Sequence, residues 1–205
     1  ALVKEVFEKQ PLRHDKGGDQ HYDLISAFIK SLRGSSPAAA LYWMLRLLDG
    51  GEDPLFIIRR MVVFAAEDVG NADPRALQVA VSCLEAFRFI GLPEGKIPLA
   101  QAVTYLATAP KSNAAYMALK TAEKVVRKQG SLEVPMHLRN APTRLLSEIG
   151  AGKGYKYPHD YPGGYVPEEY LPDEIRGEEY YEPKSIGYEK QIAAMMAWRK
   201  DRDRE

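Results

Sequence analysis

Residues 52–70 read EDPLFIIRRMVVFAAEDVG, and this stretch decides the fold class. Asp53 can accept hydrogen bonds from the free backbone donors at a helix start, and Pro54 suits the first helical position. Gly70 supplies the left-handed conformation that often ends a helix. Between these residues the apolar side chains recur at three- and four-residue spacing. The stretch is therefore predicted to be a helix over residues 54–70.

The neighbouring segments carry the same capping pattern. Ser36 with Pro37, and Asp73 with Pro74, predict helices over 37–49 and 74–90, which close at Gly50 and Gly91. Apolar periodicity predicts further helices at 21–33, 98–109 and 112–129, and two short pieces within 134–150 that are broken at Pro142. No segment alternates like a strand. Because short connections make successive helices antiparallel, residues 20–149 are predicted to form an all-α array of helical hairpins.

A different composition begins after residue 149. Residues 154–172 read GYKYPHDYPGGYVPEEYLP, and their repeated prolines exclude a helix. Prolines hold a chain extended at low entropic cost, and tyrosines offer apolar faces with a polar tip. We therefore expect residues 150–187 to form an extended arm that lies against helices of its own chain or of a neighbouring copy. Residues 188–205 are expected to hold a short C-terminal helix and a charged tail.

Composition limits the function classes. The 205 residues are 45% hydrophobic, carry a formal net charge of +0 and include 1 cysteine. Cys83 cannot form a disulfide within the chain, so a reducing, cytoplasmic compartment is expected. The apolar run at residues 38–45 is far shorter than the roughly 20 residues of a membrane-spanning helix, and no membrane association or signal peptide is expected. A dedicated nucleic-acid domain is usually strongly basic, and this chain is not.

Two motifs resemble enzyme sites without matching them. GAGKG at residues 150–154 resembles a phosphate-binding loop, but Ser147 replaces the first glycine of that motif and Gly154 replaces its Ser or Thr. The sequence therefore predicts no nucleotide cofactor, metal or catalytic residue, and no ATPase activity, for this chain. His159 and Asp160 suggest a helical metal-dependent phosphohydrolase as an alternative, although the pair lies in a proline-rich segment.

A second alternative is direct contact with DNA. Basic groups that bind phosphates and tyrosines that stack on bases are the residue types such a surface needs. The candidate contacts for DNA or a protein partner are Arg33, Arg59, Lys111, Arg139, Lys153, Tyr155, Lys156 and Tyr157. Because the net charge is close to zero, binding by this chain alone is expected to be weak.

Several ordered segments together carry a family resemblance. They include GDQHYDLISAFIKSLRGSSP at residues 18–37, the run from ALYWML to ADPRAL at 40–77, VPMHLRNA at 134–141 and GKGYKYPHD at 152–160. The chain resembles the C-terminal part of the replication-associated recombination protein A family, also called MgsA. This is an AAA+ ATPase family related to clamp loaders and to the Werner-helicase-interacting protein.

The resemblance implies that different parts of the full-length protein bind ATP and assemble the subunits. The ATPase core, with its ATP and Mg²⁺ sites, would lie upstream, and residues 1–19 would be a leader or linker from it. Residues 20–149 would be an oligomerisation domain like a clamp-loader collar that assembles subunits into a homotetramer. DNA and single-strand-binding protein would be partners of the full-length protein at stalled replication forks near the nucleoid.

Overall fold

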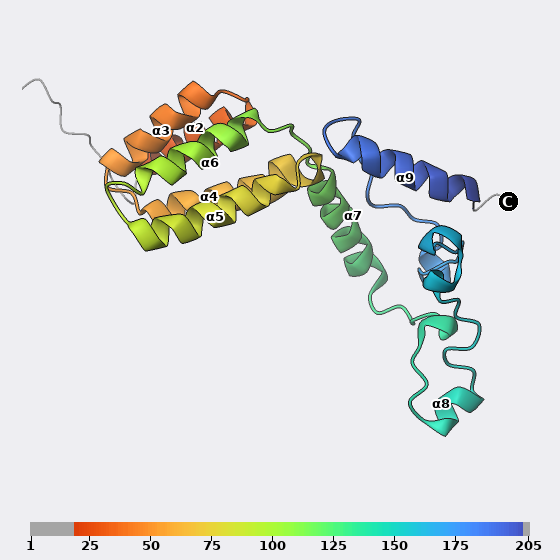
Figure 1. The fold of residues 1–205 in the computed structure, drawn as a ribbon. Helices are drawn as coiled ribbons and strands as arrows, with labels where there is room; N and C mark the ends of the chain where they lie inside the picture. The colour runs from red at the N-terminus through yellow and green to blue at the C-terminus, as the bar shows by residue number, and fades with distance from the viewer. Residues whose placement is uncertain (1–18, 203–205) are drawn as a thin grey trace, which may run out of the picture. The chain divides into compact units, whose positions relative to one another are not determined.

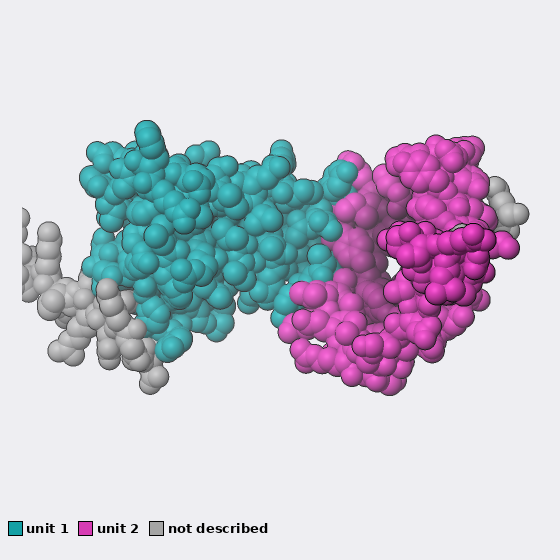
Figure 2. Space-filling view, turned by 90° about the horizontal axis from the view of Figure 1, so that it is seen from below, with its two compact units in different colours: residues 1–116, 186–188 teal, residues 117–185, 189–205 magenta. Residues whose placement is uncertain are grey.

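The computed structural model describes residues 19–202. Within this range the chain forms helices, turns and irregular segments, and no residue lies in a strand, which confirms the predicted all-α class. The expected leader at residues 1–19 lies almost wholly outside the described residues. Contacts divide the chain into unit 1, which ends at Tyr116 and includes Ile186–Tyr188, and unit 2, which comprises Met117–Ser185 and the residues from Glu189 onward (Figure 2).

Unit 1 is an array of antiparallel helices (Figure 1). Its helices are α2 (Asp19–Arg33), α3 (Pro37–Asp49), α4 (Pro54–Phe64), α5 (Arg75–Ile90) and α6 (Lys96–Thr108). Helix α6 is central, because it contacts α2, α3 and α5, while α4 packs along α5. The predicted helices are present. Helix α6 begins two residues earlier than the predicted start at Pro98, because proline is tolerated throughout the first helical turn, where its missing N–H is not needed.

The N-terminal capping residues act as the sequence predicts, whereas the left-handed conformation after α3 is adopted by Gly51 (φ +85°) and not by the predicted Gly50 (φ −75°). The Ser36 side chain accepts a hydrogen bond from the Ala39 amide at 3.4 Å, and Asp53 accepts one from the Leu55 amide at 2.9 Å. Helix α4 is shorter than the predicted 54–70, because its last turn widens into a π-helical segment at Ala65–Val69. A Cβ at Gly70 would lie 2.9 Å from the Ser112 carbonyl oxygen, so this close approach requires glycine.

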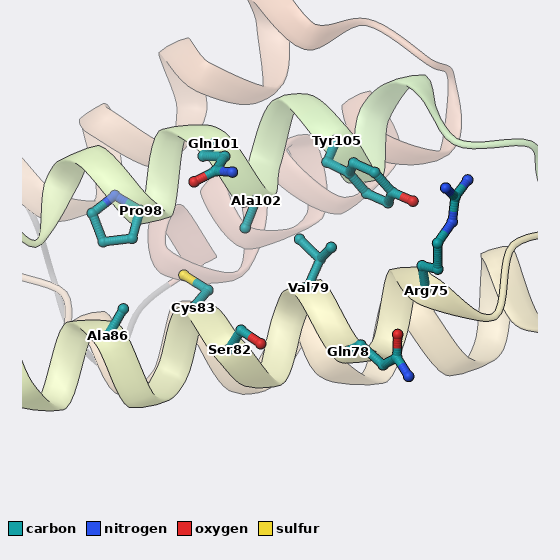
Figure 3. A pocket seen from close by; sticks show the side chains of 10 residues that line it. All are labelled: Arg75, Gln78, Val79, Ser82, Cys83, Ala86, Pro98, Gln101, Ala102 and Tyr105. Carbon is teal, nitrogen blue, oxygen red and sulfur yellow. The ribbon is translucent and has the colours of Figure 1, made fainter.

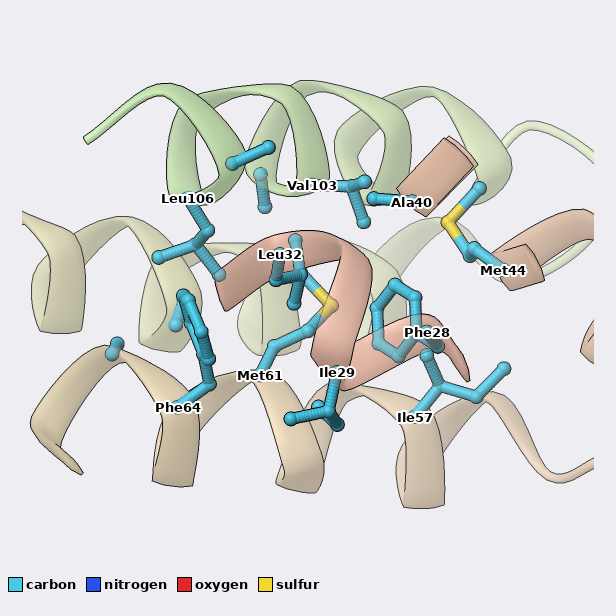
Figure 4. Close-up of a cluster of buried hydrophobic side chains, with 14 of the residues drawn as sticks. Phe28, Ile29, Leu32, Ala40, Met44, Ile57, Met61, Phe64, Val103 and Leu106 are labelled. Carbon is cyan, nitrogen blue, oxygen red and sulfur yellow. The ribbon is translucent and has the colours of Figure 1, made fainter. Parts of the chain in front are cut away.

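The core of unit 1 is formed by buried apolar side chains from all five helices, of which α5 contributes only the small residues Ala76, Ala80 and Cys83 (Figure 4). Fully buried members include Phe28, Leu32, Met44, Leu47, Ile57, Met61, Phe64, Leu99 and Leu106. Within the apolar segment MVVFAA at residues 61–66, Met61 and Phe64 are among these buried side chains. Most of that segment is covered by the chain's own helices.

Unit 2 contains fewer regular elements. Helix α7 (Ala114–Gln129) begins in unit 1 and is followed by α8 (Arg144–Glu148) and α9 (Glu189–Arg202). Between α8 and α9 the chain forms short 3-10 turns at Pro158–Asp160, Pro162–Gly164 and Asp173–Ile175. The irregular arm and the C-terminal helix therefore form where the sequence predicts them. The division into domains at residues 20–149, 150–187 and 188–205 stays a prediction.

The end of the arm belongs to unit 1. The Tyr188 amide donates a hydrogen bond to the Ala72 carbonyl at 2.8 Å, and Gly187 adopts φ +53° directly against Ala72, where a Cβ would clash with that carbonyl. Residues 186–188 thus pack on the turn between α4 and α5. None of the described helices is long and apolar enough to cross a membrane.

Candidate functional site

Two of the predicted contact residues lie together in unit 1, where both are engaged. The Arg33 guanidinium donates to both carboxylate oxygens of Asp68, at 2.6 and 3.1 Å. The Lys111 ammonium donates to the carbonyls of Ala107 and Ala109, at 3.0 and 2.5 Å, and thereby satisfies acceptors at the end of α6. Burial lowers the pKa of Lys111, although Asp68 opposes this shift. These contacts stabilise helix ends.

Two further candidates differ in how much of their charge is available. Arg59 is exposed on α4 and stacks over the Phe56 ring, with 6.0 Å between the guanidinium carbon and the ring centroid. Arg139 in unit 2 donates to the Val134 carbonyl at 2.6 Å and to Glu133 at 2.7 Å. Arg59 is therefore the more accessible cation of the two.

The remaining four candidates lie close together in the sequence, within residues 153–157. Lys153, Tyr155, Lys156 and Tyr157, here called the tyrosine loop (residues 153–157), are all exposed. Neither lysine forms an ion pair or a hydrogen bond with a side chain of the described residues. The next residues, His159 and Asp160, lie in an exposed 3-10 turn rather than on an α-helix, and residues 19–202 contain no group of three potential metal ligands.

A groove of about 430 Å³ runs between α5 and α6 in unit 1 (Figure 3). Its floor is apolar and includes Cys83, and its rim carries Gln78, Ser82 and Gln101. Burial raises the pKa of Cys83 to about 11, so this thiol is protonated at neutral pH and is a poor nucleophile.

Asp73, at one end of this groove, joins α5 to α6. It accepts hydrogen bonds from the Tyr105 hydroxyl at 2.6 Å and from the Arg75 side chain at 3.0 Å. Burial by itself raises the pKa of Asp73, but the hydrogen bonds from Tyr105 and Arg75 outweigh it and hold the pKa below its usual value. The sequence identified Asp73 as a helix cap, whereas its bond to Tyr105, 32 residues away, required the structure.

Replacing Tyr105 with phenylalanine is expected to destabilise the chain by about 1–2 kcal/mol at pH 7, because a partly buried carboxylate loses a hydrogen bond. Since the folded pKa of Asp73 is depressed, its stabilising contribution is complete above the unfolded pKa of about 3.9 and is lost as the pH falls through the folded value. Urea unfolding at pH 7 and pH 3 measures both effects. A difference between the two proteins that is the same at both pH values would contradict this account.

Exposed apolar side chains gather where α5 turns into α6. Phe89 is 93% exposed and Ile97 is 71% exposed. Ile90 and Leu92, which lie between these two residues in the sequence, are each about half exposed. We call these four residues the hairpin patch. Such a patch is uncommon on a soluble monomer and is typical of an interaction surface. Sequence periodicity missed it, because a helical pattern does not show which apolar residues lie beyond the end of the core.

Comparisons with known proteins agree with this architecture. Residues 34–200 match the family model described as the MgsA AAA+ ATPase C terminal, and residues 1–33 match that of the AAA C-terminal domain. The chain is thus a helical C-terminal region of an AAA+ protein. It belongs to the MgsA AAA+ ATPase C-terminal family.

Curated relatives place the match within longer proteins. The chain is 48% identical over 205 residues to replication-associated recombination protein A of Haemophilus influenzae, covering 100% of this chain and 46% of the relative. It is 48% identical over 203 residues to the protein of the same name from Escherichia coli K12, covering 98% of this chain and 45% of the relative. It is 41% identical over 180 residues to the ATPase WRNIP1 of Dictyostelium discoideum, covering 87% of this chain and 20% of the relative. The chain spans less than half the length of these relatives.

Proposed function

We propose that this chain is the assembly region of an AAA+ ATPase that acts in DNA replication and recombination. Membership of the MgsA C-terminal family supports the AAA+ parent, and the names of the bacterial relatives support the process. In this proposal ATP and Mg²⁺ bind in an ATPase part outside the chain. DNA and single-strand-binding protein are partners of the full-length protein.

The hairpin patch is the observation that carries the assembly role. Phe89 and Ile97 project apolar surface into solvent from the tip of α5 and α6, which burial against another chain would remove from water. Exposed Leu77 and Val81 extend apolar surface along α5. Homo-oligomers usually have closed symmetry, and the family resemblance favours four copies. The end of the arm, residues 186–188, contacts Ala72 just before α5 begins, so it lies at the opposite end of that helix from the hairpin patch.

Replacing Phe89 and Ile97 together by aspartate is expected to dissociate the oligomer, because two charges would be desolvated in the interface. Light scattering across a micromolar concentration series should then show the 23.0 kDa monomer for the variant and a multiple of that mass for the parent chain. Aspartate at Leu119 and Val126, two exposed apolar residues of α7, is a matched control that should keep the parent mass. A parent chain that stays monomeric at high micromolar concentration would refute the assembly role.

A second candidate function is direct DNA binding, and among the predicted contact residues it is supported only by Arg59 and by the tyrosine loop, whose cations form no ion pair within the described residues. Arg33, Lys111 and Arg139 use their charges in contacts within the chain. The lysines of the tyrosine loop do not. The metal-dependent phosphohydrolase alternative gains no support from the exposed turn that carries His159 and Asp160.

A further inference from the structure

The tyrosine loop combines exposed aromatic rings with cations that are not neutralised by side chains of the described residues. Tyr155 and Tyr157 are 47% and 54% exposed, so much of each ring faces water. Lys153 and Lys156 alternate with them, and their ammonium groups have no acidic partner among the described residues. Some other exposed cations of unit 2 are neutralised, as in the pairs Arg144–Glu148 and Lys200–Glu179.

The backbone before the loop is held in a defined conformation. The Ala151 amide donates to the Leu146 carbonyl at 3.0 Å, and the Gly152 amide donates to the Met136 carbonyl at 2.9 Å. Ala151 is buried, and a Cβ at Gly152 would lie 3.1 Å from the Arg139 carbonyl oxygen. Gly152 and Gly154 have φ values of +74° and +88°, which only glycine adopts readily. The loop is therefore presented by a fixed turn, which lowers the entropic cost of binding.

The rings are also restrained by their neighbours. The Tyr157 ring lies 5.0 Å from the His159 ring, centroid to centroid. Tyr155 is near enough to Tyr170 to contribute, after burial and Glu168, to the raised pKa of that phenol. Glu168 also lies near Tyr170, and Asp160 follows Tyr157 by three residues, but neither carboxylate forms an ion pair with Lys153 or Lys156.

We propose that the tyrosine loop binds single-stranded nucleic acid, with bases stacked on Tyr155 and Tyr157 and phosphates contacted by Lys153 and Lys156. Exposed aromatic faces interleaved with cations are the arrangement by which proteins bind single strands without sequence preference. In a duplex the base faces are already stacked, so this surface favours unpaired bases. An acidic peptide would engage the lysines and leave the rings unused. The inference does not depend on the assembly role.

Fluorescence anisotropy with labelled oligothymidylate at low salt tests this assignment on the full chain. We expect a dissociation constant roughly in the micromolar range, because only a few phosphates are contacted. Replacing Tyr155 and Tyr157 by leucine should weaken binding roughly tenfold for each ring, whereas phenylalanine at both positions should retain it, since the stacking face is kept. Equal binding by the leucine and parent chains would overturn the proposal.

The contribution of Lys153 and Lys156 is measured by the salt dependence of the affinity. Replacing Lys153 and Lys156 by glutamine should reduce the slope of log affinity against log salt by roughly 1.4, the value for two phosphate contacts on a single strand. Glutamine at Lys124 and Lys128, two exposed lysines of α7, removes the same charge and should leave the slope nearly unchanged. An equal loss in both variants would mean diffuse attraction and would overturn the site.

Two further measurements separate this site from other surfaces. Polyaspartate of equal charge should compete poorly with oligothymidylate, and equal competition would assign the loop to an acidic polypeptide instead. The leucine variant should keep the mass of the parent chain in light scattering. If mass and binding fall together, the loop belongs to the assembly surface and the nucleic-acid assignment fails. Loss of binding at unchanged mass supports it even if the parent chain is a monomer.

Discussion

Alanine in place of Phe28 is expected to lower the free energy of unfolding of unit 1 by about 3–5 kcal/mol, the usual cost of removing a phenyl ring from a packed core. Phe28 is 0% exposed and lies among Met44, Ile57 and other buried side chains of three helices (Figure 4). The cavity left behind loses both the transfer free energy and the packing contacts of the ring. Urea unfolding followed by circular dichroism measures the change.

The chain offers a matched control for this substitution. Phe89 is 93% exposed, so the same change to alanine there should alter monomer stability by less than about 0.5 kcal/mol. Both variants should be compared at a concentration at which they are monomers, because Phe89 is part of the proposed interface. Similar losses at the two positions would mean that Phe28 is not in a packed core.

Alanine at Glu189 is expected to destabilise unit 2 by about 3 kcal/mol, because two donors lose a buried carboxylate acceptor. Glu189 is 0% exposed, and it accepts hydrogen bonds from the Tyr181 hydroxyl at 2.9 Å and the Lys184 amide at 2.8 Å. These bonds attach the start of α9 to the end of the arm. Hydrogen exchange across residues 178–195 should rise in the variant, together with a lower melting temperature.

Glutamine at Glu189 preserves the shape and one acceptor oxygen, so its loss should be intermediate. Alanine at Glu182, an exposed glutamate of the same segment, should stay within about 0.5 kcal/mol of the parent chain. If Glu182→Ala and Glu189→Ala have equal effects, the buried carboxylate does not hold α9 in place.

The residues that the sequence alone assigned correctly act over short distances. Ser36 and Asp53 cap α3 and α4 through amides two or three residues away. Because the donor and the acceptor of a cap lie within one turn, composition and spacing suffice to locate helix ends. The same locality explains why the proline-rich arm could be predicted as irregular, since each proline acts on its own turn.

The tertiary structure decided which side chains remain exposed and unpaired, and are therefore available to bind a partner. Arg33, Arg59 and Lys153 are equivalent cations in the sequence, yet Arg33 is paired with Asp68, 35 residues away, while Lys153 has no acidic partner among the residues that the structure describes. Glutamate is usually found at the surface, yet Glu189 is fully buried. Phenylalanine is usually found in the core, yet Phe89 is exposed. Whether a side chain is buried or its charge is paired depends on which segments, distant in the sequence, pack against it. Short-range spacing in the sequence determined the helices, and the packing of those helices determined the surfaces that can bind.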